Sequence, residues 1–404
     1  MRRLSDGRLL FLLCLAEALS MSGFATWPGL LPQLQETWHL SGKAAGAVSG
    51  AFFAGYMLAV PILSGLTDRI DARRVYFFAC LLAASGCLGF ALFASDAVSA
   101  ALFQTLTGAG LAGTYMPGLK ALTDRLAGSR QPRFIAIYTA TFGVGASFSY
   151  LFSGWAGAAL GWRAAFFLGA FGPILAGLLV LAGLQPLTPH GAARRVGLLR
   201  MFGVLADRAT LGYVAGYAAH CWELFGLRSW IVALVAFSAA SSGGSLPLAP
   251  ATAAAAINLV GIPASIFGNE LAGRFGRRRY IFTVMAASGG LAWLAGAVAG
   301  WPWALLAVLV LYNVAVMADS AALTAGLISA AEPARLGAAL AVYSLFGFGA
   351  GFLGPLVFGV VLDASGGKDS ATAWLFACGS LGICCLLAPL VAMFGKRKAG
   401  LQRM

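Results

Sequence analysis

SGLTDRIDARR, residues 64–74, is a short charged segment between two long apolar runs. The runs that flank it, 44–67 and 75–95, contain no charged residue. The hydrocarbon core of a bilayer, about 30 Å thick, is crossed by about 20 apolar residues in a helix. The segment is therefore predicted to be a tight loop joining two membrane-spanning helices.

The composition extends this interpretation to the whole chain. Its 404 residues are 60% hydrophobic and 10% charged, whereas soluble domains are about 45–50% apolar and about 25% charged. A soluble enzyme of this size could not cover its surface with so few charged residues, so we predict an all-α, polytopic membrane protein. The seven cysteines lie in apolar runs without a C-x-x-C pair. We therefore expect no metal, no disulfide framework and no cofactor.

The apolar runs predict twelve transmembrane helices. Two uncharged runs, 229–269 and 280–318, are too long for one helix and are divided at 238–250 and 300–302. The predicted spans are 8–31, 43–67, 75–95, 98–121, 134–158, 163–184, 209–237, 250–272, 279–299, 303–328, 336–362 and 370–395.

The beginning of the first span resembles a secretory signal peptide. Arg2, Arg3 and Arg8 precede an apolar run, and Ala16-Glu17-Ala18 has the small-x-small form of a cleavage site. However, Glu17 lies inside the apolar run, which continues to residue 31. We therefore expect this segment to be retained as a span.

The positive charges predict the orientation. All but five of the 27 basic residues fall on one side of a twelve-span topology, the exceptions being Lys43, Lys120, Arg163, Arg228 and Lys368. The positive-inside rule places that side, with both termini, in the cytoplasm. The expected location is the cytoplasmic (inner) membrane. Because topology accounts for the net charge of +13, we expect no nucleic-acid partner.

The two halves of the chain resemble each other at an offset of about 204 residues. Residues 23–27 match 226–230, residues 64–74 match 269–279, and 142–148 match 346–352. Two copies of six helices have the same topology and are related by an axis along the membrane normal. We predict an N-terminal bundle over 1–184, a cytoplasmic linker over 185–208 and a C-terminal bundle over 209–404.

The loop 64–74 resembles the cytoplasmic motif G-x-L-x-D-R-x-G-x-[RK]-[RK] of the major facilitator superfamily. Leu66 and four charged residues match it, while Ser64 and Asp71 replace its glycines. The copy at 269–279 keeps the later glycine and the basic residues but has Gly273 in place of the aspartate. The positions assigned to gating are Asp68, Arg69, Arg73, Arg74, Arg274, Arg277 and Arg278. An ion pair of Asp68 across the two halves would hold the cytoplasmic side shut; the alternative is that these charges only set topology.

The resemblance covers the whole chain and implies the fold of that superfamily. Two pseudo-symmetric six-helix bundles then surround a central cavity lined by spans 1, 4, 7 and 10, and the halves rock in alternating access. Two departures weaken the case for a drug antiporter. Gln104 stands where members often carry an arginine before a G-x-G step, and the Gly-Pro motif of span 5 is absent. Gly108-x-Gly110-x-x-Gly113 spells a nucleotide fingerprint but lies within an apolar run, so we assign it to helix packing.

Charged residues inside spans are costly and are therefore candidates for function. Glu17, His220, Glu223, Arg228 and Asp319 all fall on spans 1, 7 and 10. His220 and Glu223, three residues apart, share a helical face. We predict Glu223 as the proton site and His220 as its modulator, with Glu17 and Asp319 as further proton-coupling candidates. A permanently paired structural ion and a helix–helix hydrogen bond are the alternatives.

The candidates for substrate binding are a cation, aromatic side chains and amides on spans 1, 4, 7 and 10. Arg228 could attract an anion or only anchor its helix at the interface. The set comprises Arg228, Tyr115, Asn313, Trp27, Trp222 and Gln104.

The predicted function is secondary active transport of a small polar or anionic organic solute, coupled to protons. The alternatives are a proton-coupled drug or metabolite efflux antiporter and a sensor with a transporter fold that moves no substrate. The sequence offers no nucleophile–base pair, so we expect no enzymatic activity. The expected partners are the solute, the proton and the lipid bilayer, with the protein acting as a monomer.

Overall fold

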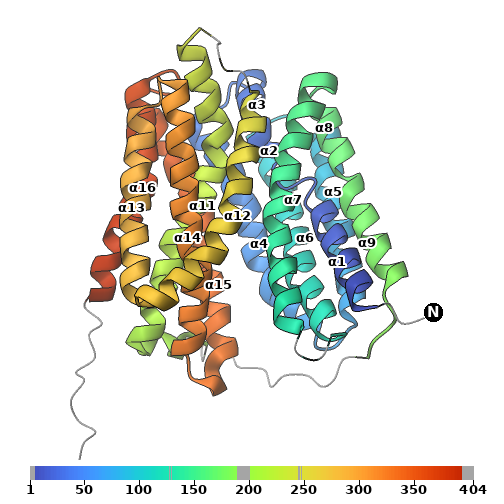
Figure 1. Cartoon of the computed structure of the whole chain (residues 1–404). Coiled ribbons are helices and arrows are strands. Elements are labelled where there is room, and N and C mark those ends of the chain that lie inside the picture. The colour runs from blue at the N-terminus through green and yellow to red at the C-terminus, as the bar shows by residue number, and fades with distance from the viewer. Residues whose placement is uncertain are drawn as a thin grey trace, which may run out of the picture.

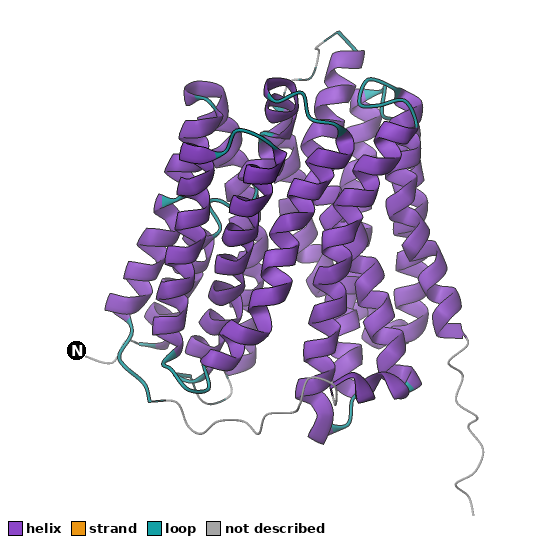
Figure 2. Cartoon of the chain, turned by 180° about the vertical axis from the view of Figure 1, so that it is seen from behind, coloured by secondary structure: helices purple, strands orange, loops and turns teal. Residues whose placement is uncertain are grey.

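The computed structural model describes residues 5–126, 128, 130–188, 201–243, 246 and 248–393. Throughout these residues the chain is helical, with no strand, and Figure 2 shows the helices joined mainly by short loops at the two ends of the molecule. Nine helices of the described part are long and apolar enough to cross a membrane. The three other predicted spans are the first, which is interrupted, the fourth, which is rich in glycine and threonine, and the last.

The N-terminal half contains nine helices, which form one group in Figure 1. Their bounds are α1 Asp6–Ser20, α2 Thr26–Gly29, α3 Leu31–Thr37, α4 Gly42–Leu66, α5 Ala72–Phe93, α6 Ala97–Thr123, α7 Gln131–Leu160, α8 Trp162–Gly169 and α9 Phe171–Gly183.

The C-terminal half forms the second group (Figure 1). Its elements are the 3-10 turn η1 Phe202–Ala206, α11 Arg208–Ser241, α12 Pro250–Phe275, α13 Arg277–Ala297, α14 Pro302–Ala330, the 3-10 turn η2 Pro333–Arg335, α15 Leu336–Ala364 and α16 Ala371–Met393. Most of the predicted linker, residues 189–200, lies outside the described residues.

The first span is not the single helix over 8–31 that we predicted. α1 ends at Ser20, five residues form turns, and α2 and α3 continue the span to Thr37. Backbone groups at the break are paired from other helices: the Ser149 hydroxyl accepts from Ala25 N at 2.8 Å and donates to Ser22 O at 2.8 Å. A broken helix is tolerated at membrane depth where protein satisfies its backbone. Its counterpart α11 is continuous, so the halves differ here.

The most extensive contacts between the halves are those of α4 with α15 and of α7 with α12, and α11 also contacts α2 and α3. Glycines let the backbones approach closely: a Cβ on Gly46 would lie 2.3 Å from Pro355 O, and one on Gly50 would lie 2.4 Å from Phe352 O. Small residues favour such contacts between membrane helices. The glycines of the 108–113 stretch serve the same purpose, since a Cβ on Gly108 would lie 1.9 Å from Phe52 O. Its assignment to packing is confirmed.

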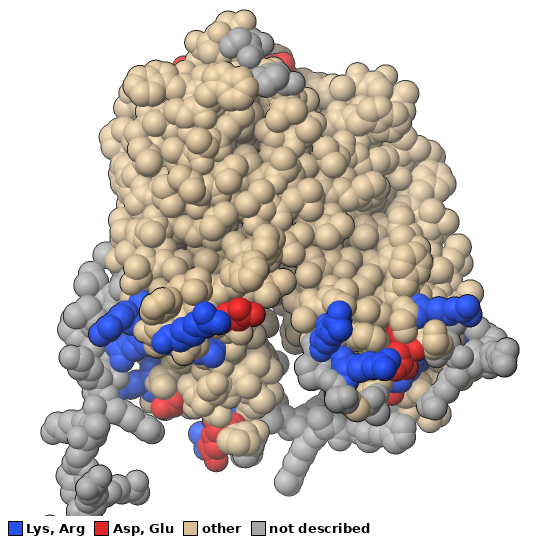
Figure 3. Space-filling model, in the orientation of Figure 1, with Lys and Arg blue, Asp and Glu red and all other residues tan. Residues whose placement is uncertain are grey.

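Lys and Arg side chains gather at one end of both halves (Figure 3). We call this end the basic face; it carries the α4–α5, α6–α7, α12–α13 and α14–α15 connections. Figure 3 also shows the molecule hollowed between the halves at this end. Whether the basic face is cytoplasmic stays a prediction.

Candidate functional site

A central cavity of about 480 Å³ lies between the two halves. Helices α4, α6 and α7 of the first half and α11, α12, α14 and α15 of the second supply its walls. Asn269 and Glu270, close to the end of α12, line the part nearest the basic face, and Phe24 and Arg228 line the opposite end. A cavity of this size is in the range that holds small organic ligands.

Nine phenylalanine and tyrosine side chains line the cavity. Phe53 of α4 and Phe225 of α11 have ring centroids 4.2 Å apart, and so do Tyr56 of α4 and Phe348 of α15. These pairs connect the two halves, so the walls move apart only if the paired rings separate. The aromatic residues that line the cavity are Phe24, Phe52, Phe53, Tyr56, Tyr115, Phe142, Tyr217, Phe225 and Phe348.

Arg228 supplies a buried positive charge at the closed end of the cavity. Its side chain is 6% exposed, and it is the one Lys or Arg among the described lining residues. The guanidinium donates from Nε to Asn258 Oδ1 at 3.0 Å and lies 6.0 Å from the ring centroid of Phe142. Within the described part of the chain no carboxylate lies within 4.0 Å of it. Burying a cation without an anionic partner is costly, so the site favours an anion.

His220 and Asp319 form the second charged feature of the cavity wall. His220 Nδ1 lies 2.7 Å from Asp319 Oδ1, and both side chains are 2% exposed. His220 lines the cavity while Asp319 lies behind it on α14. The imidazole stacks on Tyr217 at a centroid distance of 5.8 Å. The cavity wall therefore contains an imidazole backed by a carboxylate, and both side chains are shielded from solvent.

The two buried glutamates lie outside the cavity lining. Glu223 Oε2 accepts hydrogen bonds from Ser288 Oγ at 2.8 Å and from Cys385 Sγ at 3.0 Å, inside the C-terminal bundle. Glu17 Oε2 accepts from Tyr138 OH at 3.1 Å inside the N-terminal bundle. His220 and Glu223 were expected to act together from one helical face, but His220 contacts α14 whereas Glu223 contacts α13 and α16.

The remaining substrate-binding candidates are divided among three places. Tyr115 lines the central cavity. Gln104 and Trp27 line a smaller pocket that also reaches Arg228. Trp222 donates to Ser380 O at 3.2 Å. Asn313 donates to Ile257 O at 2.7 Å, so both of these side chains are used in contacts between helices of the C-terminal bundle.

The end of the molecule opposite the basic face is sealed by contacts between the halves. The Asp363 carboxylate at the end of α15 accepts from the backbone N–H groups of Gly42 at 2.7 Å and Lys43 at 2.8 Å, at the start of α4. Deeper in, Tyr150 OH donates to the carbonyl of Arg228. Sequence reasoning missed both residues, because neither belongs to a motif. Their roles depend on partners 78 and more residues away.

The gating motif is only partly engaged. Asp68 has no ion-pair partner among the described residues, as expected when the basic face is open. Its neighbour Asp71 is paired instead, with Arg73 Nε at 2.8 Å and Arg125 at 3.6 Å. Asp71 also accepts from Leu187 N at 2.9 Å, just beyond α9. The replacement of a motif glycine by Asp71 was the signal for this cluster.

The other motif positions lie at the basic face as separate groups. Arg277 donates to Ala322 O at 3.3 Å, and Arg278 lies over the ring of Phe282 at 5.4 Å. The exposed motif positions are Arg69, Arg74, Arg274 and Arg278. Their gating role stays a prediction.

The chain matches the family described as Major Facilitator Superfamily over residues 13–251. The 4-hydroxybenzoate transporter PcaK of Acinetobacter baylyi is 24% identical over 153 residues, 38% of this chain and 33% of that protein. The probable sphingolipid transporter spinster homolog 1 of Arabidopsis thaliana is 27% identical over 140 residues, 34% of this chain and 28% of that protein. The matches therefore span about a third of each relative's length.

Solved structures of transporters share the whole fold. A bacterial homolog of the human lysosomal transporter Spinster, in an inward-facing and occupied conformation, has a TM-score of 0.75 at 17% identity, over 96% of both chains. The nucleoside transporter NupG has a TM-score of 0.75 at 15% identity, over 96% of this chain and 100% of that one. At these identities the comparison shows the fold alone.

Proposed function

The chain belongs to the major facilitator superfamily, and from that premise we propose that it is a proton-coupled secondary transporter of a small organic anion with an apolar body. The observation that carries the proposal is Arg228, a buried cation at the closed end of an aromatic cavity with no carboxylate partner in the described chain. An incoming carboxylate would supply the missing partner.

The charge of the site sets the preferred charge of the substrate. A hydrogen bond to a charged group contributes about 1.5–3 kcal/mol, because the buried charge is otherwise left poorly solvated. One guanidinium matches one carboxylate in bidentate geometry. The site therefore favours a monoanion over a dicarboxylate, whose second charge would meet aromatic walls.

The walls set the preferred body of the substrate. Six phenylalanines and three tyrosines surround the space, and burial of apolar surface contributes about 25 cal/mol per Å². An aromatic or other apolar monocarboxylate fits this chemistry. The name of one relative points in the same direction, since 4-hydroxybenzoate is an aromatic carboxylate. The sphingolipid named for the other relative shares the apolar body but is not a carboxylate.

The His220–Asp319 pair is the proton-coupling site that the geometry favours. Glu223 and Glu17 are candidates too, but each is hydrogen-bonded behind the cavity wall. His220 lies eight residues before Arg228 on α11, about 12 Å along the helix axis. Opposite charges at that distance attract by about 1.4 kcal/mol at an effective dielectric constant of about 20. A bound anion would thus favour a proton on His220 about tenfold.

Alternating access follows from the two ends of the cavity. The structure is open at the basic face and closed at the other end by Asp363 and Tyr150. To reach the opposite state, the halves must break these contacts and close the basic face, where Asp68 has no ion-pair partner among the described residues.

Binding of benzoate to the purified protein, measured by isothermal titration calorimetry, tests this function. We expect Arg228→Gln to weaken binding roughly 10- to 100-fold. Arg163→Gln is the matched control, because Arg163 is exposed and lies over Trp162 outside the cavity. Equal binding by wild type and Arg228→Gln would overturn the anion site. Binding of the lipophilic cation tetraphenylphosphonium without any binding of benzoate would favour the efflux antiporter instead.

A flux measurement separates a transporter from a sensor. Proteoliposomes containing the wild-type protein should accumulate labelled benzoate faster than protein-free liposomes and faster than liposomes containing Arg228→Gln. Binding in solution without any flux above these two controls would support the sensor.

A further inference from the structure

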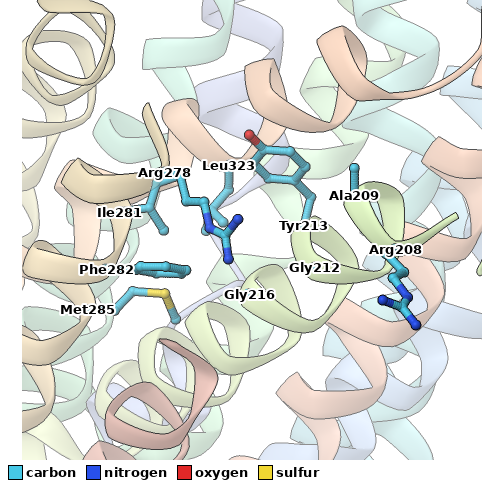
Figure 4. A pocket seen from close by; sticks show the side chains of 10 residues that line it. All are labelled: Arg208, Ala209, Gly212, Tyr213, Gly216, Arg278, Ile281, Phe282, Met285 and Leu323. Atoms are coloured by element: carbon cyan, nitrogen blue, oxygen red, sulfur yellow. The ribbon is translucent and has the colours of Figure 1, made fainter. Parts of the chain in front are cut away.

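A second hollow, which we call the arginine groove, opens at the basic face of the C-terminal bundle. Its volume is about 150 Å³, and it lies among the first turns of α11 and α13 and the side of α14. Figure 4 shows Arg208 and Arg278 on two sides of the groove, with the Gly212–Gly216 stretch of α11 between them and Phe282 beside Arg278. The groove shares no lining residue with the central cavity.

The arginine groove combines a charged rim with an apolar floor. Arg208 and Arg278 are exposed. The floor residues are Ile281, Phe282, Met285 and Leu323. Gly212 leaves the groove open, because a Cβ placed there would meet nothing within 4 Å. A lipid has the same order of parts, with a charged headgroup followed by an apolar chain.

We propose that the arginine groove binds an anionic phospholipid of the leaflet at the basic face, with the phosphate between the two arginines and the start of an acyl chain on the glycine-lined floor. Charge complementarity selects this occupant, since basic pockets between membrane helices attract anionic headgroups. The segment after residue 393 is a poor competitor, because it carries Lys396, Arg397, Lys398 and Arg403.

Native mass spectrometry of the purified full chain, titrated with phosphatidylglycerol or phosphatidylcholine, tests this proposal. The wild type is expected to bind one phosphatidylglycerol in preference to phosphatidylcholine. Arg208→Gln/Arg278→Gln is expected to weaken phosphatidylglycerol binding on the order of 30-fold, from about fivefold for each arginine. The control is Arg8→Gln/Arg133→Gln, which removes two exposed arginines from the basic face of the other bundle.

A second variant tests the floor without changing the charge. Gly212→Leu fills the open space and is expected to weaken binding of both lipids while keeping the preference for phosphatidylglycerol. It also decides the question if the double variant fails to fold. The proposal is overturned if the control pair loses as much binding as the groove pair. It is also overturned if Gly212→Leu binds like wild type, or if glycerol phosphate binds as tightly as the lipid.

Discussion

The contacts that close the end opposite the basic face allow a quantitative prediction for Asp363. Its carboxylate accepts two backbone hydrogen bonds at the start of α4, at 2.7 and 2.8 Å. Asp363 is exposed to solvent, and the solvent weakens these two hydrogen bonds. A side-chain cap on a helix N-terminus contributes about 1 kcal/mol, and a negative charge there adds about 0.3–1 kcal/mol. Asp363→Ala is therefore expected to destabilise the closed seal by about 1–2 kcal/mol.

That loss shifts the balance between the two access states. Because about 1.4 kcal/mol corresponds to a factor of ten, Asp363→Ala should raise the population open at this end roughly tenfold. Asp363→Asn keeps an acceptor oxygen and loses only the charge term, so it should raise that population about threefold. Asp369→Ala is the control, because Asp369 is an exposed carboxylate of the same connection with no partner among the described residues.

Double electron–electron resonance between spin labels at Glu36→Cys and Lys368→Cys measures the two populations. Glu36 lies at the end of α3 in the first half and Lys368 in the α15–α16 connection of the second. The long-distance population should increase in the order Asp369→Ala, Asp363→Asn, Asp363→Ala. An unchanged distance distribution in Asp363→Ala, or an equal change in Asp369→Ala, would show that the Asp363 carboxylate does not hold this end closed.

Three further outcomes follow from single residues. Gly108→Ala should lower the thermal midpoint by several degrees, because its Cβ would lie 1.9 Å from a backbone oxygen, while Gly65→Ala, with nothing within 4 Å, should not. Asp71→Asn should cost about 1–3 kcal/mol in thermal unfolding by breaking its pairs with two arginines, and Asp68→Asn should cost less than about 0.5 kcal/mol. Glu223→Gln should leave calorimetric benzoate affinity within about twofold, because Glu223 does not line the cavity.

Run length and charge predicted most of the architecture. Only helices and closed barrels satisfy their backbones in lipid, so long apolar runs fix the helices almost alone. The break after Ser20 could not be predicted in this way. It depends on Ser149, more than 120 residues away, whose hydroxyl pairs with the free backbone groups.

The candidate site was harder to predict than the helices that carry it. In a membrane protein the lipid-facing and buried sides of a helix are both apolar, so periodicity does not give a helix's rotation about its axis. Spacing therefore placed His220 and Glu223 on one face, and the neighbouring helices separated them. Arg228 was found because an isolated charge in a span is informative without knowledge of rotation.

Proton uptake on anion binding tests whether the anion site at Arg228 is coupled to the His220–Asp319 pair. Isothermal titration of the protein with benzoate in buffers of different ionisation enthalpy gives the number of protons bound per anion from the slope of the observed enthalpy. We expect proton uptake in wild type that disappears in His220→Gln, with benzoate binding itself retained. A zero slope in wild type, or the same slope in His220→Gln, would contradict coupling through the His220–Asp319 pair.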